Sequence, residues 1–138
     1  MTLKEIFPKA TYSEPKFFLI PQIEMELELK MPQKLKKLYL ETDGFRENIG
    51  NSKYLFSLKD DDGIGSLLST TKFFHNEKIF PDIHKYIFFG SSSAGEYWAI
   101  NTQNSTVISY HYSMGNEFEK LDNDIVELYK KDYSLYNL

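Results

Sequence analysis

Cysteine is absent from this chain, which excludes disulfide bonds and metal sites built from thiolates. Long apolar runs are also absent: none approaches the ~18 residues that a membrane-spanning helix needs, and residues 1–8 lack the apolar core of a secretory signal. Glycine and proline are sparse, with seven and five residues, and no repeat or long linker divides the 138 residues. We therefore expect one soluble, cytoplasmic domain over residues 1–138.

An excess of basic residues is missing as well. The chain has 16 lysines and arginines against 20 aspartates and glutamates, which gives a net charge of -4. Direct binding of nucleic acid is not expected, because it requires a basic surface that neutralises phosphates. A basic or neutral protein partner suits this charge better.

Aromatic side chains are abundant, at 16% of the chain, and they supply a large apolar area for a core. The most informative stretch is residues 86–100, where two apolar runs flank a connection rich in glycine and serine. This pattern predicts a strand, a tight connection and a second strand. Phe88 and Phe89 are adjacent and point to opposite faces of an extended chain, which predicts a central strand covered on both sides.

The remaining periodicity predicts an α+β domain. An extended lead-in over residues 16–20 precedes Pro21, which suits the first turn of a helix, although glutamates 24, 26 and 28 alternate in a strand-like way. We expect a mainly antiparallel sheet of about five or six strands with N-terminal and C-terminal helices packed on it. The further expected elements are a helix over 33–42, a hairpin of strands 54–58 and 64–68, an ambiguous segment 70–78, strands 97–101 and 106–112, and a helix capped by Asp122.

Residues 90–95 are similar to two catalytic loops without completing either. Gly90 and Gly95 have the spacing of a phosphate-binding loop, but Glu96 follows where such a loop needs a lysine. Ser93 lies in a segment like a nucleophile elbow, with His111 as a conceivable base, yet that elbow belongs to a doubly wound α/β sheet. We expect no catalytic residue, and a small serine hydrolase or nucleotide-binding enzyme is kept as the opposing hypothesis.

We also expect no metal and no cofactor. The acidic turn at residues 60–63 is similar to part of a calcium loop, but carboxylates are missing at the first and last positions of such a loop. The three histidines lack the close spacing of zinc ligands. A solvated turn and ordinary histidines explain these residues.

A protein-binding surface is the better interpretation of residues 96–98. Trp98 is expected to face the core, which would turn Tyr97 toward solvent or a partner. Aromatic side chains framed by carboxylates, such as Glu96, are typical of protein-binding surfaces. The acidic residues between 117 and 124 are instead expected to favour the N-terminus of a helix.

Several short motifs occur in a defined order: Ile23, Glu26-Leu27, Met31-Pro32, the helix 33–40, the stop at Asp43-Gly44, and the runs 87–91 and 95–100. Together they resemble the SUKH superfamily, which comprises bacterial immunity proteins and a yeast regulator of cell-wall synthesis. The resemblance spans roughly residues 17–130. Where the family usually has Leu-Pro and Asn-Gly, this chain has Met-Pro and Asp-Gly, which keep the apolar residue and the capping glycine.

The resemblance implies an α+β fold, no catalysis and, in bacteria, neutralisation of a cognate toxin by tight binding. Many such toxins are basic nucleases, which an acidic surface would complement. The alternative is a regulatory scaffold with several partners. We predict partner contacts near the 60–63 turn and the 91–97 loop, at Asp60, Asp61, Asp62, Ser92, Ser93, Glu96 and Tyr97, and structural roles for Pro32, Gly44, Phe89, Gly90, Gly95 and Trp98.

Overall fold

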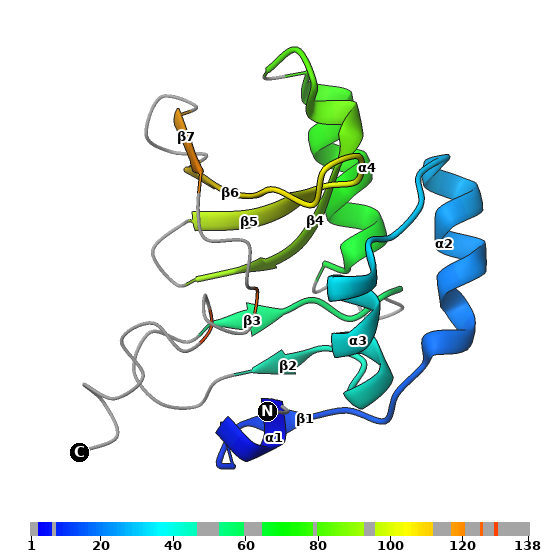
Figure 1. The fold of residues 1–138 in the computed structure, drawn as a ribbon, viewed down its shortest axis with the longest axis vertical. Helices are drawn as coiled ribbons and strands as arrows, with labels where there is room; N and C mark the ends of the chain where they lie inside the picture. The colour runs from blue at the N-terminus through cyan, green and yellow to red at the C-terminus, as the bar shows by residue number, and fades with distance from the viewer. Residues whose placement is uncertain are drawn as a thin grey trace.

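The computed structural model describes residues 3–6, 8–46, 53–59, 65–78, 80–92, 96–111 and 117–120, together with the single positions 125 and 129. Seven strands form one antiparallel sheet, in which the spatial order of the strands is their order in the chain (Figure 1). The expected α+β class is confirmed. The turn at 60–63, Ser93 and Gly95 lie outside the described residues.

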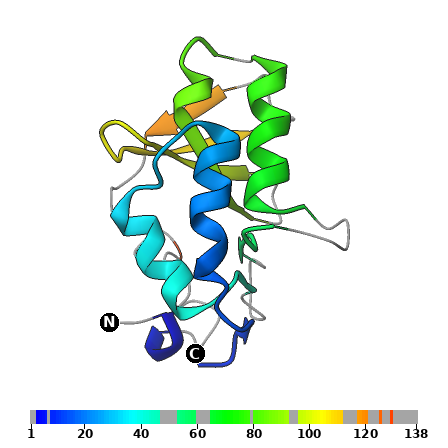
Figure 2. The same cartoon turned by 90° about the vertical axis from the view of Figure 1, so that its right-hand side faces the viewer.

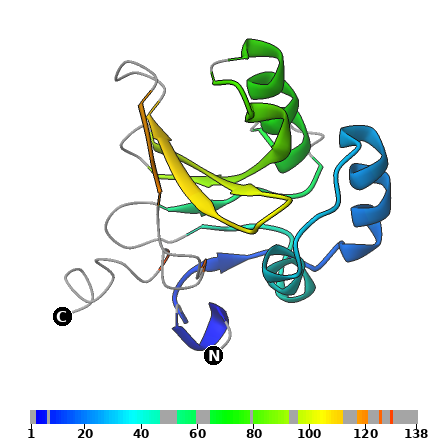
Figure 3. The same ribbon diagram turned by 45° about the horizontal axis from the view of Figure 1, so that its top comes forward.

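The sheet runs from three very short strands to four longer ones. Its strands are β1 (Thr11–Tyr12), β2 (Phe45–Arg46), β3 (Tyr54–Leu55), β4 (Tyr86–Ser91), β5 (Glu96–Asn101), β6 (Val107–His111) and β7 (Glu117–Lys120). The helices are α1 (Leu3–Ile6), α2 (Ile20–Leu27), α3 (Gln33–Glu41) and α4 (Leu67–Glu77), with the short 3₁₀ helices η1 (Phe17–Leu19) and η2 (Ile83–Lys85). β7 lies at the end of the sheet away from α2 and α3 (Figures 1 and 3).

Prolines mark where α2 and α3 begin. Pro21 lies in the first turn of α2, as predicted, and buried Pro32 is the N-cap of α3. The helix continues to Leu27 and ends at Glu28 with a left-handed φ of 57°, so the strand-like alternation of the glutamates has no structural counterpart. The prediction of an extended segment over residues 16–20 is wrong, because Phe17–Leu19 form the 3₁₀ helix η1.

Gly44 has a role other than closing α3. The helix ends at Glu41, and its C-cap Thr42 is extended. Gly44 lies beyond the cap with φ of +90°, where a Cβ would come within 2.9 Å of both Leu55 O and Ser57 N. The absence of a side chain at Gly44 therefore allows the chain that leaves α3 to lie close to the segment after β3. These two segments are also joined by a hydrogen bond, in which the Leu58 amide donates to buried Asp43 Oδ1 at 2.8 Å.

The predicted hairpin of strands 54–58 and 64–68 is wrong. β3 pairs with β2 and β4, and residues 67–77 form α4 instead of a strand. Ser66 is the N-cap of α4: its hydroxyl accepts from the Ser69 amide, and the Ser69 hydroxyl accepts from the Ser66 amide, which completes a capping box. This reciprocal cap defines a helix start where the apolar residues alone suggested a strand.

β4 is the middle strand of the seven, as its adjacent phenylalanines predict. A bulge between Phe88 and Gly90 shifts its register against β5, and the Phe56 amide donates to Phe89 O at 2.8 Å. Phe88 and Phe89 are both fully buried and belong to different apolar clusters. The central strand is therefore covered on both faces.

Two apolar clusters form the described core. The larger contains Phe89, Trp98 and side chains of α2, α3 and the start of α4, together with buried positions 125 and 129. The smaller contains Phe88, Ala99, Ile108 and Tyr110, and α4 covers it through Phe74. Successive residues of β5 point to opposite faces of the sheet, which we call the Trp98 face and, for the side of Tyr97 and Ala99, the Phe74 face.

The C-terminal region differs in part from the prediction. Residues 117–120 pair with β6 as strand β7 instead of starting a helix. Most of the helix predicted from Asp122 lies outside the described residues, but Ile125 and Tyr129 are helical and buried.

Candidate protein-binding surface

The predicted site lies around the connection between β4 and β5, of which Ser92 and Glu96 form the described ends. The Ser92 amide donates to Glu96 O at 2.9 Å, and the Ser92 hydroxyl donates to Glu96 Oε1 at 3.4 Å. The two ends of the connection are thus held together by backbone and side-chain contacts. A serine hydroxyl that faces a carboxylate does not favour an approaching phosphate.

Gly90 is a packing position beside this connection. A Cβ at Gly90 would collide with the Tyr129 hydroxyl and with Tyr54 O. That hydroxyl donates to Tyr54 O at 2.8 Å, and buried Lys53 Nζ donates to Tyr129 O at 3.2 Å. The space that a phosphate-binding glycine would leave for a ligand is therefore filled by a tyrosine.

Two buried tyrosines bind the carbonyls around β3. Tyr129 donates to Tyr54 O, and Tyr39 of α3 donates to Phe56 O at 2.6 Å. Burial raises the pKa of both hydroxyls well above the usual value, and the Asp43 carboxylate adds to the effect at Tyr39. Both therefore remain neutral donors and fix the end of the sheet next to the candidate site.

The structure separates the predicted residues Glu96 and Tyr97. Trp98 is only 2% exposed and packs edge to face on Tyr129, with ring centroids 5.1 Å apart. Tyr97 is half-buried on the opposite face, 5.0 Å from the Phe74 ring and 6.4 Å from the Phe56 ring. By alternation Glu96 shares the Trp98 face, where its cross-strand neighbour is His111. The Glu96 carboxylate and the Tyr97 ring therefore lie on opposite faces of the sheet, both next to the β4–β5 connection.

An open groove lies between α4 and β5 on the Phe74 face. It has a volume of about 360 Å³ and is lined by Ser69, Thr70, Phe73, Phe74 and Tyr97. Phe73 is 50% exposed, although it packs edge to face on buried Phe74 at 5.2 Å. Of these residues the sequence identified only Tyr97, because the phase of α4, and hence the outward position of Phe73, depends on the cap at Ser66.

The N-terminus of α4 beside this groove has its amide groups engaged. The Leu67 amide donates to Ser57 O at 2.8 Å, the Leu68 amide to Leu58 O at 3.2 Å, and the Ser69 amide to Ser66 Oγ at 3.1 Å. A helix N-terminus attracts anions mainly through unpaired amides. This one is therefore a poor site for phosphate.

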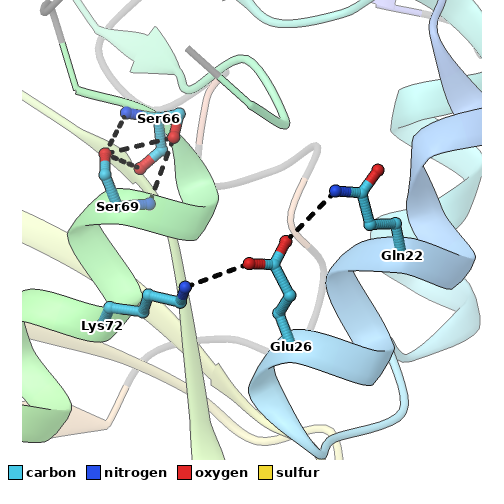
Figure 4. A network of polar contacts seen from close by, with 5 residues as sticks. All are labelled: Gln22, Glu26, Ser66, Ser69 and Lys72. Atoms are coloured by element: carbon cyan, nitrogen blue, oxygen red, sulfur yellow. Dashed lines mark hydrogen bonds and ion pairs between the residues drawn. The ribbon is translucent and has the colours of Figure 1, made fainter.

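The other flank of α4 is joined to α2. Lys72 Nζ donates to Glu26 Oε1 at 3.1 Å, and Gln22 Nε2 donates to Glu26 Oε2 at 3.4 Å (Figure 4). The hydrogen bond from Lys72 is the main cause that lowers the pKa of the Glu26 carboxyl. Figure 2 shows α2 and α4 side by side in front of the strands, and Figure 4 shows the Lys72 ammonium group directed to Glu26 on α2.

The described residues offer little for other chemistry. Within them, no group of three or more acidic or histidine side chains is placed to hold a metal ion. The described helices also include none with the length and apolar character to cross a membrane. The feature that remains is a surface with exposed aromatic and polar side chains.

A comparison with protein families identifies the family of this chain. A family model described as the SMI1 / KNR4 family (SUKH-1) matches residues 19–133, which is most of the chain. Among curated proteins, no sequence matches. From the extent of the family match, the chain belongs to the SMI1 / KNR4 (SUKH-1) family of the SUKH superfamily.

Proposed function

We propose that this protein is a bacterial immunity protein of the cytoplasm that neutralises a cognate toxin by binding it directly. The observation that carries the proposal is the family match over residues 19–133. The SUKH superfamily includes toxin immunity proteins, and its members bind partner proteins such as toxins. The net charge of -4 suits a basic partner such as a nuclease, because complementary charge accelerates association.

We further propose that the protein is not an enzyme. Members of the family are generally non-catalytic. Gly90 faces the Tyr129 hydroxyl, and the Ser92 hydroxyl faces a carboxylate, so neither supports phosphate binding. Replacement of Ser93 by Ala, followed by assays of ester and nucleotide turnover, separates the two classes: an activity that the substitution abolishes would favour an enzyme.

The proposed contact surface is the end of the sheet formed by the β4–β5 connection. Ser92 and Glu96 approach it from the Trp98 face, and Tyr97 from the Phe74 face. Asp60, Asp61, Asp62 and Ser93 belong to the same proposal on sequence grounds. A half-buried tyrosine next to acidic groups is typical of an interface centre with a charged rim.

Co-expression with the toxin encoded beside this gene tests the function. We expect growth to be rescued and the two proteins to elute together from a sizing column. If growth is not rescued and no complex forms, the immunity role is wrong.

Three substitutions test the surface. We expect Tyr97→Ala and Glu96→Lys each to weaken the complex at least about ten-fold, which is ~1.4 kcal/mol, because each removes a central contact or reverses its charge. Phe18→Ala is the matched control, since Phe18 is 68% exposed but lies on η1. Equal affinities for all three variants in calorimetry would place the contact elsewhere.

A regulatory scaffold is the second candidate. The family description includes SMI1 / KNR4, and the superfamily contains a yeast cell-wall regulator. A pull-down that recovers several unrelated partners at similar yields would favour the scaffold, whereas one dominant partner encoded next to this gene would favour immunity.

A further inference from the structure

The groove between α4 and β5 has a lining that restricts what can occupy it. Of the five described residues that line it, Phe73, Phe74 and Tyr97 are aromatic, and the other two carry hydroxyls. Its volume of about 360 Å³ is at the small end of the ~300–1,000 Å³ typical of ligand sites. A single long side chain fits this space better than a large cofactor.

The net charge of the chain favours a cation in the groove, and the described lining does not oppose one. None of the five described residues that line it is charged. Lys72, the neighbour of Phe73 in the sequence, is directed to Glu26 on the other flank of α4. The chain as a whole carries a net charge of -4. A cationic side chain therefore meets no repelling ammonium group from the lining, and the overall charge attracts it.

The aromatic and hydroxyl lining also matches the chemistry of a guanidinium group. Tyrosine and phenylalanine rings attract cations at their faces, and more often arginine than lysine. The planar guanidinium packs along rings and has five N–H donors, which hydroxyl oxygens such as that of Thr70 accept. An anionic occupant is disfavoured, because the first amides of α4 are already engaged by Ser57, Leu58 and Ser66.

We infer that the α4–β5 groove is a docking site for an arginine side chain presented by the protein partner. This inference rests on the proposed function, because it assumes a protein partner, and it names the chemistry that the partner brings. The aliphatic part of the arginine lies against Phe73 and Tyr97, and its guanidinium reaches the Thr70 hydroxyl at the start of α4.

The test uses small probes and the whole chain. Acetyl-arginine methylamide is titrated into the ¹⁵N-labelled protein, with acetyl-norleucine methylamide as a neutral probe of similar stem length. We expect amide shifts that cluster at Ser69, Thr70, Phe73 and Tyr97 and are at least three-fold larger with the arginine probe. Equal shifts with both probes, or shifts that cluster elsewhere, overturn the inference.

Two variants and a control make the result specific. Thr70→Lys brings a cation to the rim, and Tyr97→Leu removes a ring; both are expected to reduce the arginine-induced shifts at least three-fold. Thr70 is partly exposed, so Thr70→Lys serves even where Tyr97→Leu folds poorly. Phe18→Ala is expected to leave the shifts unchanged. Shifts in both groove variants that equal those of the unaltered protein contradict the inference.

The probe experiment is independent of the toxin. If the arginine probe gives specific shifts but no toxin complex forms, the immunity role is wrong and the groove still binds arginine. If a toxin complex forms and Thr70→Lys leaves its affinity unchanged, the immunity role holds and the inference about the groove is wrong.

Discussion

Trp98 and Tyr97 are neighbours on β5, yet they lie in very different surroundings. Trp98 is enclosed by Tyr129 and by the larger cluster, which receives side chains from α2, α3 and positions 125 and 129. Tyr97 lies on the face that α4 covers, where a groove remains open beside Phe73. The surroundings of Trp98 are closed, whereas those of Tyr97 leave room at the flank of α4. Stability is therefore expected to depend on Trp98 more than on Tyr97, and binding in the groove on Tyr97.

The largest expected effect comes from comparing these two neighbours. Trp98→Ala removes a fully enclosed ring and is expected to lower the free energy of unfolding by about 3–5 kcal/mol. Tyr97→Ala removes a half-buried ring next to a groove and is expected to cost about 1 kcal/mol. Urea denaturation followed by circular dichroism measures both. Similar losses for the two variants would show that the faces do not differ in this way.

Gly90→Ala tests how tightly the Trp98 face is closed. The added methyl collides with the Tyr129 hydroxyl and with Tyr54 O, so a loss of about 1–3 kcal/mol is expected. Tyr129→Phe removes one of the two colliding atoms. In that background we expect Gly90→Ala to cost less, as measured by a double-mutant cycle in urea. Additive losses would mean that the hydroxyl is not the obstacle.

The bridge between α2 and α4 offers a smaller effect on the Phe74 face. Lys72→Met removes the contact to Glu26 and is expected to reduce stability slightly at low salt, with little effect at high salt, because salt screens exposed ion pairs. Thermal unfolding in both conditions checks this. Lys37→Met is the control, since Lys37 is exposed on α3. An equal loss for the two variants would indicate that the bridge contributes nothing specific.

The smallest expected effect is a pH dependence from His75, which lies on α4 and is half-buried. Its Nε2 donates to Tyr86 O at 2.7 Å, while desolvation, with a further contribution from His84, lowers its pKa below the usual value. The unfolded chain then binds a proton more readily, so stability falls as the pH drops below about 6.5. We expect His75→Gln, which keeps a donor, to lose less stability than the original protein between pH 7.5 and 5.5 in urea titrations. Parallel curves for the two proteins would contradict this.

Local patterns predicted the central strands but not α4. Adjacent Phe88 and Phe89 required a strand covered on both faces, as observed. Residues 64–68 are too short an apolar run to distinguish a strand from the start of a helix. The hydrogen bonds between Ser66 and Ser69 decide that question, and a pair of serines is a weak sequence signal.

The directions of the side chains around the proposed site were predictable only in part. Alternation placed Trp98 inward, as observed, and Tyr97 on the opposite face, where the ring is half-buried against Phe74. The same alternation puts Glu96 on the face opposite to Tyr97, so treating the two as one flat patch overlooked the direction of the side chains. The groove needs both β5 and α4, and its Phe73 wall follows from the phase of a helix that the sequence left ambiguous.

The hydrogen bonds that start α4 also join the two ends of the preceding segment. Leu67 and Leu68 donate to Ser57 and Leu58, so the chain before Lys59 and the chain after Ser66 are held together. Insertions or substitutions that leave the cap at Ser66 intact need not move β3 or α4, because closing a somewhat longer connection costs little. Related proteins are therefore free to vary this connection to meet new partners while the helix and the sheet stay as they are.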